Sequence, residues 1–271
     1  MKIAFIGGGN MGEAILAALI RQEISTPSEI CVHDASAERL EYLKQKYAVV
    51  TADCNSAAIA GAEVIILAIK PQTLGQVGTE LAGKIEKGQL VMSIIAGKKL
   101  STLGAALRCE SIVRAMPNTP AQIGRGVTVW TTLEKGVTPA QWGTAAAILN
   151  VMGKAIYVEH EKYLDMATAV SGSGPAYVFL FMESLTAAAV AIGLPEDIAA
   201  QLVQQTVAGS AEYAAVTNLD LAELRRRVTS PGGTTAAALQ GLSDGQFDAL
   251  IASAVCAAHT RAKELGEQDT V

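Results

Sequence analysis

The sequence has few of the residues that build metal centres, disulfide frameworks or acid–base pairs. Its 271 residues include three histidines and four cysteines, and the cysteines lie far apart without a C-x-x-C pair. We therefore expect no zinc site, no disulfide framework and no metal cofactor. Charged residues make up only 17% of the chain and its formal net charge is −5, which argues against a nucleic-acid-binding surface.

No secretion signal and no membrane span are expected. The chain starts with the pattern of a folded strand instead of a basic, cleavable leader. Its longest apolar stretch, Met166–Met182, is interrupted by Ser171–Pro175 and bounded by Asp165 and Glu183. That pattern predicts a broken, buried helix. We interpret the chain as a soluble, cytoplasmic protein.

The most informative feature present is a glycine-rich turn near the start of the chain. A buried-strand pattern, Lys2–Ile6, leads into Gly-Gly-Gly-Asn-Met-Gly at residues 7–12, and an apolar helical pattern follows. In the G-x-G-x-x-G arrangement, Gly7 permits the tight turn, Gly9 lets a pyrophosphate approach the backbone, and Gly12 lets the helix pack closely. The amides at the helix start then bind phosphate. This pattern predicts a dinucleotide site.

An acidic residue supports the same prediction. A second strand pattern, Glu29–His33, ends in Asp34, which follows Gly12 by 22 residues. A dinucleotide fold places its ribose-binding carboxylate at about this distance.

The first half of the chain alternates between strand and helix patterns up to about Glu159. Strands buried on both faces with helices between them predict an α/β fold with a doubly wound parallel sheet of the Rossmann type. The predicted strands are Lys2–Ile6, Glu29–His33, Glu63–Ile69, Leu90–Ile95, Ser111–Ala115, Val127–Thr132 and Ala155–Val158. The predicted helices between them include Ala37–Lys46, Pro71–Ala82 and Pro139–Met152. The last of these links two further strands, which extends the sheet beyond six.

The second half is alanine-rich and helical, so we divide the chain into residues 1–159 and an all-α domain, residues 160–271. The predicted helices are Lys162–Ile192, Glu196–Val216, Leu221–Arg227, Thr234–Leu242 and Gln246–Leu265. Pro195 starts one helix and Ser243-Asp244 is expected to cap the last. Alanine faces bury little area per residue, so we expect these helices to form a homodimer, and the dimers to form a larger ring.

The three histidines are poorly placed for catalysis. His33 ends a strand, His160 lies at the domain boundary, and His259 lies in the last helix, so each is expected to be structural. Reduction of a ketone requires a positioned proton donor, whereas an imine nitrogen can be protonated before hydride arrives. The scarcity of strong acids therefore favours reduction of a C=N bond.

Three further segments have functional character. Residues 67–72 follow a strand at the sheet edge where dinucleotides bind, and residues 114–120 carry two prolines after another strand. Residues 228–235 place hydroxyls and backbone amides at a helix start, which is typical of a carboxylate site but also of an ordinary N-cap turn. The residues alone leave both interpretations open.

Taken together, these segments resemble the pyrroline-5-carboxylate reductase family, whose members reduce a cyclic imino acid to proline. The resemblance spans the whole chain in order, through residues 5–12, 68–72, 116–120, 171–177 and 228–235. It implies a Rossmann domain followed by a helical dimerisation domain, an active site shared between subunits, and reduction of 1-pyrroline-5-carboxylate by NADPH or NADH as the last step of proline biosynthesis.

The glycine motif and the resemblance together predict the site residues. The predicted cofactor-binding residues are Ile6, Gly7, Gly8, Gly9, Asn10, Met11, Gly12, Asp34, Asn55, Ala68, Ile69, Lys70, Pro71, Ala96 and Asn118. The predicted substrate-binding residues are Ser230, Pro231, Gly232, Gly233, Thr234 and Thr235. Thr235 is also the predicted catalytic residue, because its hydroxyl approaches the ring nitrogen.

One departure leaves the cofactor preference open. Members of this family often carry a small polar or basic residue where this chain has His33-Asp34, which suits a 2′-phosphate. An ionised Asp34 accepts hydrogen bonds from a free ribose but repels a phosphate, whereas Ser36 or Arg39 could still bind one if Asp34 turns away.

Two rival functions remain. The β-hydroxyacid dehydrogenases resemble this chain in their glycines at the start of the interdomain helix, but they carry a lysine shortly afterwards, and residues 175–179 contain none. The second rival is a non-catalytic redox sensor, which has no need of an anion site at Pro231–Thr235.

Overall fold

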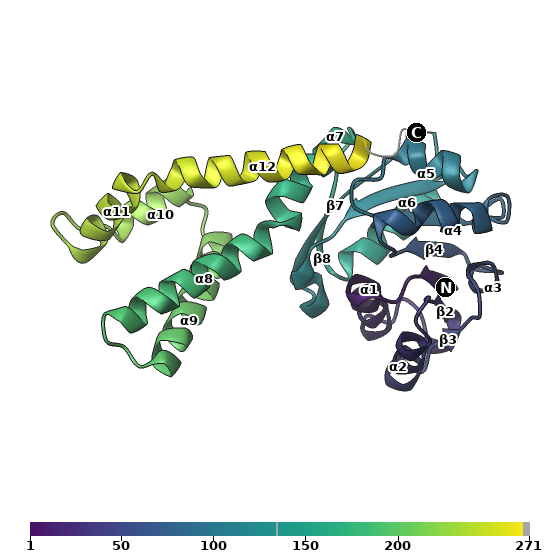
Figure 1. Cartoon of the computed structure of the whole chain (residues 1–271), viewed down its shortest axis with the longest axis horizontal. Coiled ribbons are helices and arrows are strands. Elements are labelled where there is room, and N and C mark those ends of the chain that lie inside the picture. The colour runs from purple at the N-terminus through teal and green to yellow at the C-terminus, as the bar shows by residue number, and fades with distance from the viewer. Residues whose placement is uncertain (134, 268–271) are drawn as a thin grey trace. The chain divides into compact units, whose positions relative to one another are not determined.

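The computed structural model describes residues 1–133 and 135–267 (Figure 1). The chain divides into two compact units. The first holds Met1–Ser173 together with the described residues from Ala258 onward, and the second holds Gly174–Ala257.

The first unit is built on an eight-stranded sheet with the strand order β3-β2-β1-β4-β5-β6-β7-β8. Its strands are β1 (Ile3–Ile6), β2 (Ile30–His33), β3 (Val50–Thr51), β4 (Val64–Leu67), β5 (Leu90–Ser93), β6 (Ile112–Met116), β7 (Gly126–Thr132) and β8 (Gly153–Tyr157). The first six strands follow the Rossmann order. The predicted Rossmann sheet, extended beyond six strands, is therefore confirmed, although β3 was not among the seven strands predicted.

One strand pair departs from the predicted parallel sheet. Strand β7 runs antiparallel to β6, while β8 runs parallel to β7. The connection from β6 to β7 contains only a 3-10 helix, Thr119–Ile123, and a parallel crossover needs a dozen or more residues. Helix α6 (Pro139–Asn150) provides such a crossover between β7 and β8.

Helices cover both faces of this sheet. Alternate residues of β1 enter two different cores, with Ile3 and Phe5 in one and Ala4 and Ile6 in the other. The first core also contains residues of α1 (Asn10–Arg21), α2 (Ala37–Tyr47) and α6. The second contains residues of α3 (Asn55–Ala58), α4 (Leu74–Leu81) and α5 (Leu100–Leu107). Because side chains alternate along a strand, this arrangement buries both faces.

Two contacts attach segments beyond the sheet to the first unit. The buried Arg114 of β6 forms ion pairs with Glu161 at 2.9 Å and with Asp165 at 2.8 Å, at the start of α7 (Lys162–Ala167). The loop after β5 lies against the end of α12, where a Cβ added to Gly97 would be 3.1 Å from the Leu265 Cβ. Packing therefore continues beyond β8, and the division at residues 159 and 160 stays a prediction about functional domains.

The second unit is entirely helical, as predicted. It contains α8 (Gly174–Ala191), α9 (Glu196–Val216), α10 (Leu221–Arg227), α11 (Thr234–Asp244) and the first part of α12 (Phe247–Glu267). Pro195 is the N-cap of α9, as expected. The prediction that Ser243-Asp244 caps the last helix is wrong, because α11 continues through Asp244 and α12 starts after Gln246, whose φ is +56°.

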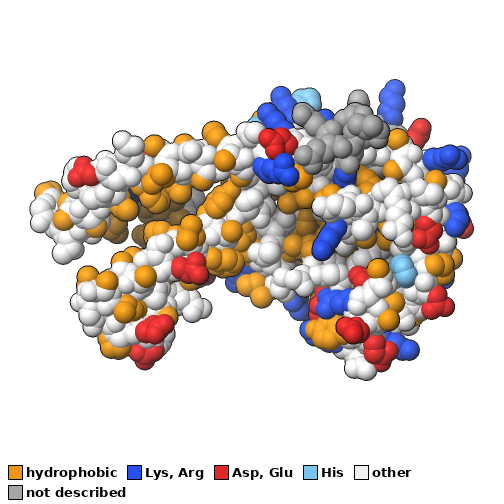
Figure 2. All heavy atoms as spheres, viewed as in Figure 1, with side chains coloured by type: hydrophobic (Ala, Val, Ile, Leu, Met, Phe, Trp, Pro, Cys, Tyr) orange, Lys and Arg blue, Asp and Glu red, His pale blue; other side chains and the backbone are white. Residues whose placement is uncertain are grey.

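The apolar helix α8 has no buried residue in this single chain. Its exposed side chains include Phe179 at 58% and Leu180 at 62%, and Figure 2 shows hydrophobic side chains along the helices of this unit. Among the described residues, the stretch Lys162–Ala191 is long and apolar enough, by length and composition, to cross a membrane. A helix that packs against a second protein chain can have the same length and apolar composition.

Candidate functional site

The glycine turn lies at the carboxyl end of β1, where the sheet changes direction. Strand β1 lies between β2 and β4, and the chain crosses from one side of β1 to the other after β3. Dinucleotides bind in the crevice at such a switch point. The adjacent end of β4 closes onto the turn, since the Ala68 amide donates to the Ile6 carbonyl at 2.8 Å.

Two of the three motif glycines are required by the fold itself. Gly7 has φ +99°, a conformation that side chains disfavour, and a Cβ there would lie 2.5 Å from the Ala68 oxygen. A Cβ on Gly12 would lie 2.6 Å from the Gly7 oxygen. Gly7 therefore makes the turn and Gly12 allows α1 to pack against it, as the sequence predicts.

Gly9 has a different role, because nothing in the protein requires it to be glycine. A Cβ at this position would meet no atom within 4 Å, and its φ of −63° is open to any residue. Gly9 is also the N-cap of α1, and no side chain among the described residues caps that helix end. The result is an exposed backbone cradle with free helix-start amides, which suits the phosphates of a dinucleotide.

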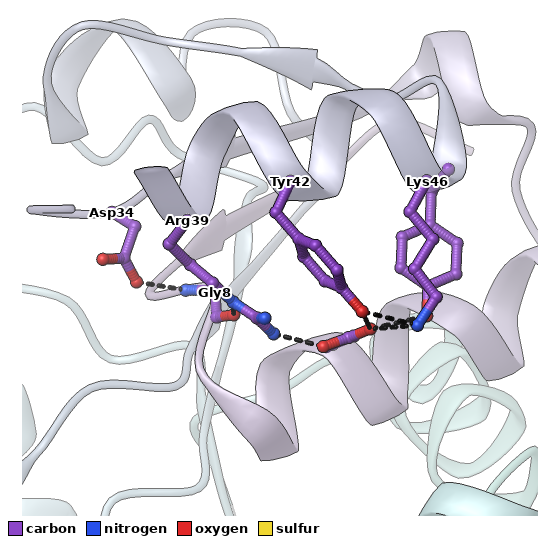
Figure 3. Close-up of polar contacts among 7 residues, drawn as sticks. Gly8, Asp34, Arg39, Tyr42 and Lys46 are labelled. Atoms are coloured by element: carbon purple, nitrogen blue, oxygen red, sulfur yellow. Dashed lines mark hydrogen bonds and ion pairs between the residues drawn. The ribbon is translucent and has the colours of Figure 1, made fainter. Parts of the chain in front are cut away.

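Asp34 is fixed beside this turn. Its Oδ2 accepts a hydrogen bond from the Gly8 amide at 2.7 Å (Figure 3), and its Oδ1 accepts one from the Ser36 amide at 2.9 Å. The carboxylate therefore lies at the end of β2, at the position where dinucleotide folds bind the adenosine ribose.

The other predicted cofactor residues lie after parallel strands of the same sheet. Residues 68–71 follow β4, Ala96 follows β5 and Asn118 follows β6, so all three segments lie at its carboxyl edge. The Asn118 side chain accepts from the Val127 amide at 2.9 Å, which orders the loop before β7.

Asn55 starts α3 after the edge strand β3. Its buried side-chain amide donates to Glu80 at 2.6 Å. Burial raises the pKa of Glu80, but hydrogen bonds from Asn55 and Ser56 outweigh it and hold the pKa below its usual range. Asn55 is therefore fixed by an ionised carboxylate.

A polar cluster that was not predicted from the sequence lies next to the turn, and we call it the Glu13 cluster. The Glu13 carboxylate of α1 pairs with Arg39 and with Lys46 at 3.0 Å, and it accepts from Tyr47 at 2.8 Å and Tyr42 at 3.2 Å. Burial raises the Glu13 pKa, but hydrogen bonds from Lys46, Tyr47 and Arg39 lower it to about 2. The spacing of residues 39, 42 and 46 on one face of α2 was the available signal.

The predicted substrate residues belong to the second unit. Gly233 is the N-cap of α11 and no described side chain caps this helix. Gly232 has φ +70°, and the Gly233 amide donates to the Ser230 carbonyl at 3.0 Å, so the turn before the helix is tight. Thr235 is half-buried, and no described residue forms a hydrogen bond with its hydroxyl. The turn thus presents free amides and a free hydroxyl.

Two protein families match segments of the chain. Residues 161–265 match the family described as pyrroline-5-carboxylate reductase dimerisation. Residues 2–97 match the family described as NADP oxidoreductase, coenzyme F420-dependent.

Relatives that match nearly the whole chain include pyrroline-5-carboxylate reductases. The pyrroline-5-carboxylate reductase of Synechocystis sp. is 42% identical over 268 residues, covering 99% of each chain. That of Pseudomonas aeruginosa is 39% identical, covering 98% of this chain and 97% of the relative.

Solved structures agree. A pyrroline-5-carboxylate reductase from Coxiella burnetii has a TM-score of 0.87 at 39% identity, covering 97% of this chain and 98% of that one. The Plasmodium falciparum pyrroline carboxylate reductase with NADP bound has a TM-score of 0.89 at 30% identity, covering 98% of each. With its NAD(P)-binding Rossmann domain and helical dimerisation domain, this chain belongs to the pyrroline-5-carboxylate reductase family.

Proposed function

We propose that this chain reduces 1-pyrroline-5-carboxylate to L-proline with NAD(P)H, the last step of proline biosynthesis. The observation that carries the proposal is similarity over nearly the whole chain to enzymes named for this substrate. The open cradle at Gly9 supplies the binding geometry that such a reductase needs. The bound nicotinamide supplies a hydride, and the protein supplies binding, orientation and a proton donor.

The cofactor's pyrophosphate is bound by the glycine turn in this proposal. Residues 9–12 offer the free amides at the start of α1, with Ile6 and Gly7 shaping the turn below them. Asp34 binds the adenosine ribose. The segments after β4, β5 and β6, together with Asn55, contact the rest of the dinucleotide along the carboxyl edge of the sheet.

The substrate carboxylate is bound by the turn at Ser230–Thr235. Free amides at the start of α11 and the positive end of its helix dipole favour an anion there. The Thr235 hydroxyl then donates to the ring nitrogen as hydride adds to the carbon of the C=N bond. That donor can be weak, because an imine nitrogen is readily protonated.

The function is tested by measuring NADH and NADPH oxidation with 1-pyrroline-5-carboxylate or 2-keto acids, and NAD+ and NADP+ reduction with 3-hydroxy acids. We expect oxidation only with the cyclic imine, and no change when EDTA is added. Oxidation without substrate, or a preference for a keto acid, would contradict the proposal. Activity that vanishes with chelator and returns with a divalent ion would contradict direct, metal-free hydride transfer.

We further propose a homodimer formed through the helical domain, arranged into a ring of dimers in the cytoplasm. The chain's dimerisation domain and the exposed apolar side chains of α8 support this assembly. A soluble reductase of a small acid needs neither a membrane nor nucleic acid.

A charge introduced on the exposed face of α8 should therefore dissociate the proposed homodimer. Phe179→Asp places a charge in the proposed interface, and we expect light scattering to report a smaller species at micromolar concentration. Val50→Asp changes a comparably exposed residue, on the edge strand β3 of the first unit, and should leave the mass unchanged. A wild-type monomer with full activity would refute the dimer.

A further inference from the structure

Asp34 brings a fixed negative charge to the ribose position. Both of its oxygens accept backbone amide hydrogen bonds, at 2.7 Å from Gly8 and 2.9 Å from Ser36. A carboxylate held by two backbone donors has little freedom to turn away from a ligand. It suits the 2′-hydroxyl of NADH and repels the 2′-phosphate of NADPH.

Arg39 is the nearby cation that a 2′-phosphate would need, but it is already engaged. Its Nε donates to the Gly8 carbonyl, its Nη2 pairs with Glu13, and its guanidinium lies 4.8 Å from the centre of the Tyr42 ring. Figure 3 shows the guanidinium directed along the turn toward α1 and away from the Asp34 carboxylate. Arg39 is therefore directed at the glycine turn instead of at the ribose.

Glu13 is what keeps Arg39 there. Its carboxylate is largely buried, with 16% of the side chain exposed, and it stays ionised because Lys46, Arg39 and two tyrosines donate to it. Lys46, the second cation on this face of α2, is bound to the same carboxylate at 3.0 Å. Both cations therefore neutralise Glu13 and neither faces Asp34.

We propose that Glu13 is a positioning residue for cofactor choice, which retains Arg39 at the turn so that Asp34 acts unopposed and the chain binds NADH in preference to NADPH. The proposal rests on the proposed role of the glycine turn as the dinucleotide site. Asp34 contacts the ribose directly, whereas Glu13 affects the choice of cofactor only by positioning Arg39.

The test is direct binding of NADH and NADPH, measured by nucleotide fluorescence or calorimetry without substrate. For the wild type we expect NADH to bind about tenfold more tightly, the scale of one close charge repulsion near a surface. Asp34→Ser should remove most of that difference. Glu13→Gln keeps the side-chain shape and should strengthen NADPH binding about three- to fivefold, with NADH binding unchanged, because Arg39 is released.

Two controls separate this role from a merely structural one. Adding Arg39→Ala to Glu13→Gln should return the ratio of the two dissociation constants to the wild-type value. Arg39→Ala alone should leave that ratio unchanged, even if loss of the Gly8 contact weakens both cofactors. Glu41→Gln, the same substitution at an exposed carboxylate of α2 that bonds Gln45, should change neither constant.

Equal binding of the two cofactors by the wild type, or tighter binding of NADPH, would overturn the proposal. A Glu13→Gln protein that melts normally and keeps the wild-type ratio of the NADPH and NADH dissociation constants would show that Glu13 has no role in cofactor choice. If Glu13→Gln fails to fold, a higher ratio of the NADPH to the NADH dissociation constant in Arg39→Ala would overturn the proposal by itself, since it would mean that Arg39 already binds the 2′-phosphate in the wild type. Failure to bind either dinucleotide would instead contradict the assignment of the glycine turn as the dinucleotide site.

Discussion

A Gly9→Val protein is expected to fold normally and to lose its binding of NADH and NADPH. A Cβ at Gly9 meets no protein atom within 4 Å and its backbone angles suit any residue, so the substitution adds no internal clash. The added side chain instead occupies the cradle in which a pyrophosphate would meet the backbone. Losing two hydrogen bonds to a charged group, at about 1.5–3 kcal/mol each, weakens binding by about 100-fold or more.

The measurement is the dissociation constant of each cofactor, with the melting temperature and circular dichroism as checks of folding. Gly143→Val provides a matched control, since a Cβ at that exposed position of α6 also meets open space. We expect it to change neither binding nor folding. A folded Gly9→Val protein with unchanged affinity would show that this loop does not bind the pyrophosphate.

Thr235→Val is expected to lower turnover about 10- to 100-fold, below the upper range for general acid catalysis. Valine keeps the shape of threonine and removes only the hydroxyl. No described residue bonds that hydroxyl, so the substitution removes no hydrogen bond from the fold. Backbone amides at the start of α11 can still bind the substrate carboxylate, so the effect should lie in kcat more than in KM.

Thr234→Val is the matched control for this prediction. Thr234 precedes Thr235 by one residue, so it is turned by about 100° around the helix, and its side chain is exposed. We expect only a small change in kcat for Thr234→Val. Equal, small effects of the two substitutions, or a change confined to KM, would leave Thr235 as a residue of the helix start with no part in the chemical step.

Local sequence determined the glycine turn and most of the helices. Gly7 and Gly12 act through contacts with residues close by in the turn or in the adjacent strand, and such roles can be read from a short motif. Helices α9 and α10 have the bounds that the sequence predicts, because proline and acidic residues mark their starts. The position of the predicted cofactor residues at one sheet edge could also be expected from the sequence, since the parallel strands β1, β2 and β4 end there.

Only the tertiary structure decided the features that depend on distant partners. Strand β3 is two residues long, too short for a periodic pattern, and its pairing with β2 defines it. The direction of β7 follows from the length of a loop. Asp34 accepts a hydrogen bond from Gly8, and Glu13 accepts one from Arg39; each pair is 26 residues apart in the sequence. These contacts form only when the carboxyl end of β2 and the start of α2 meet the glycine turn. The sequence by itself determined a dinucleotide-binding reductase, whereas long-range contacts decided which of its charges lie beside the proposed ribose site.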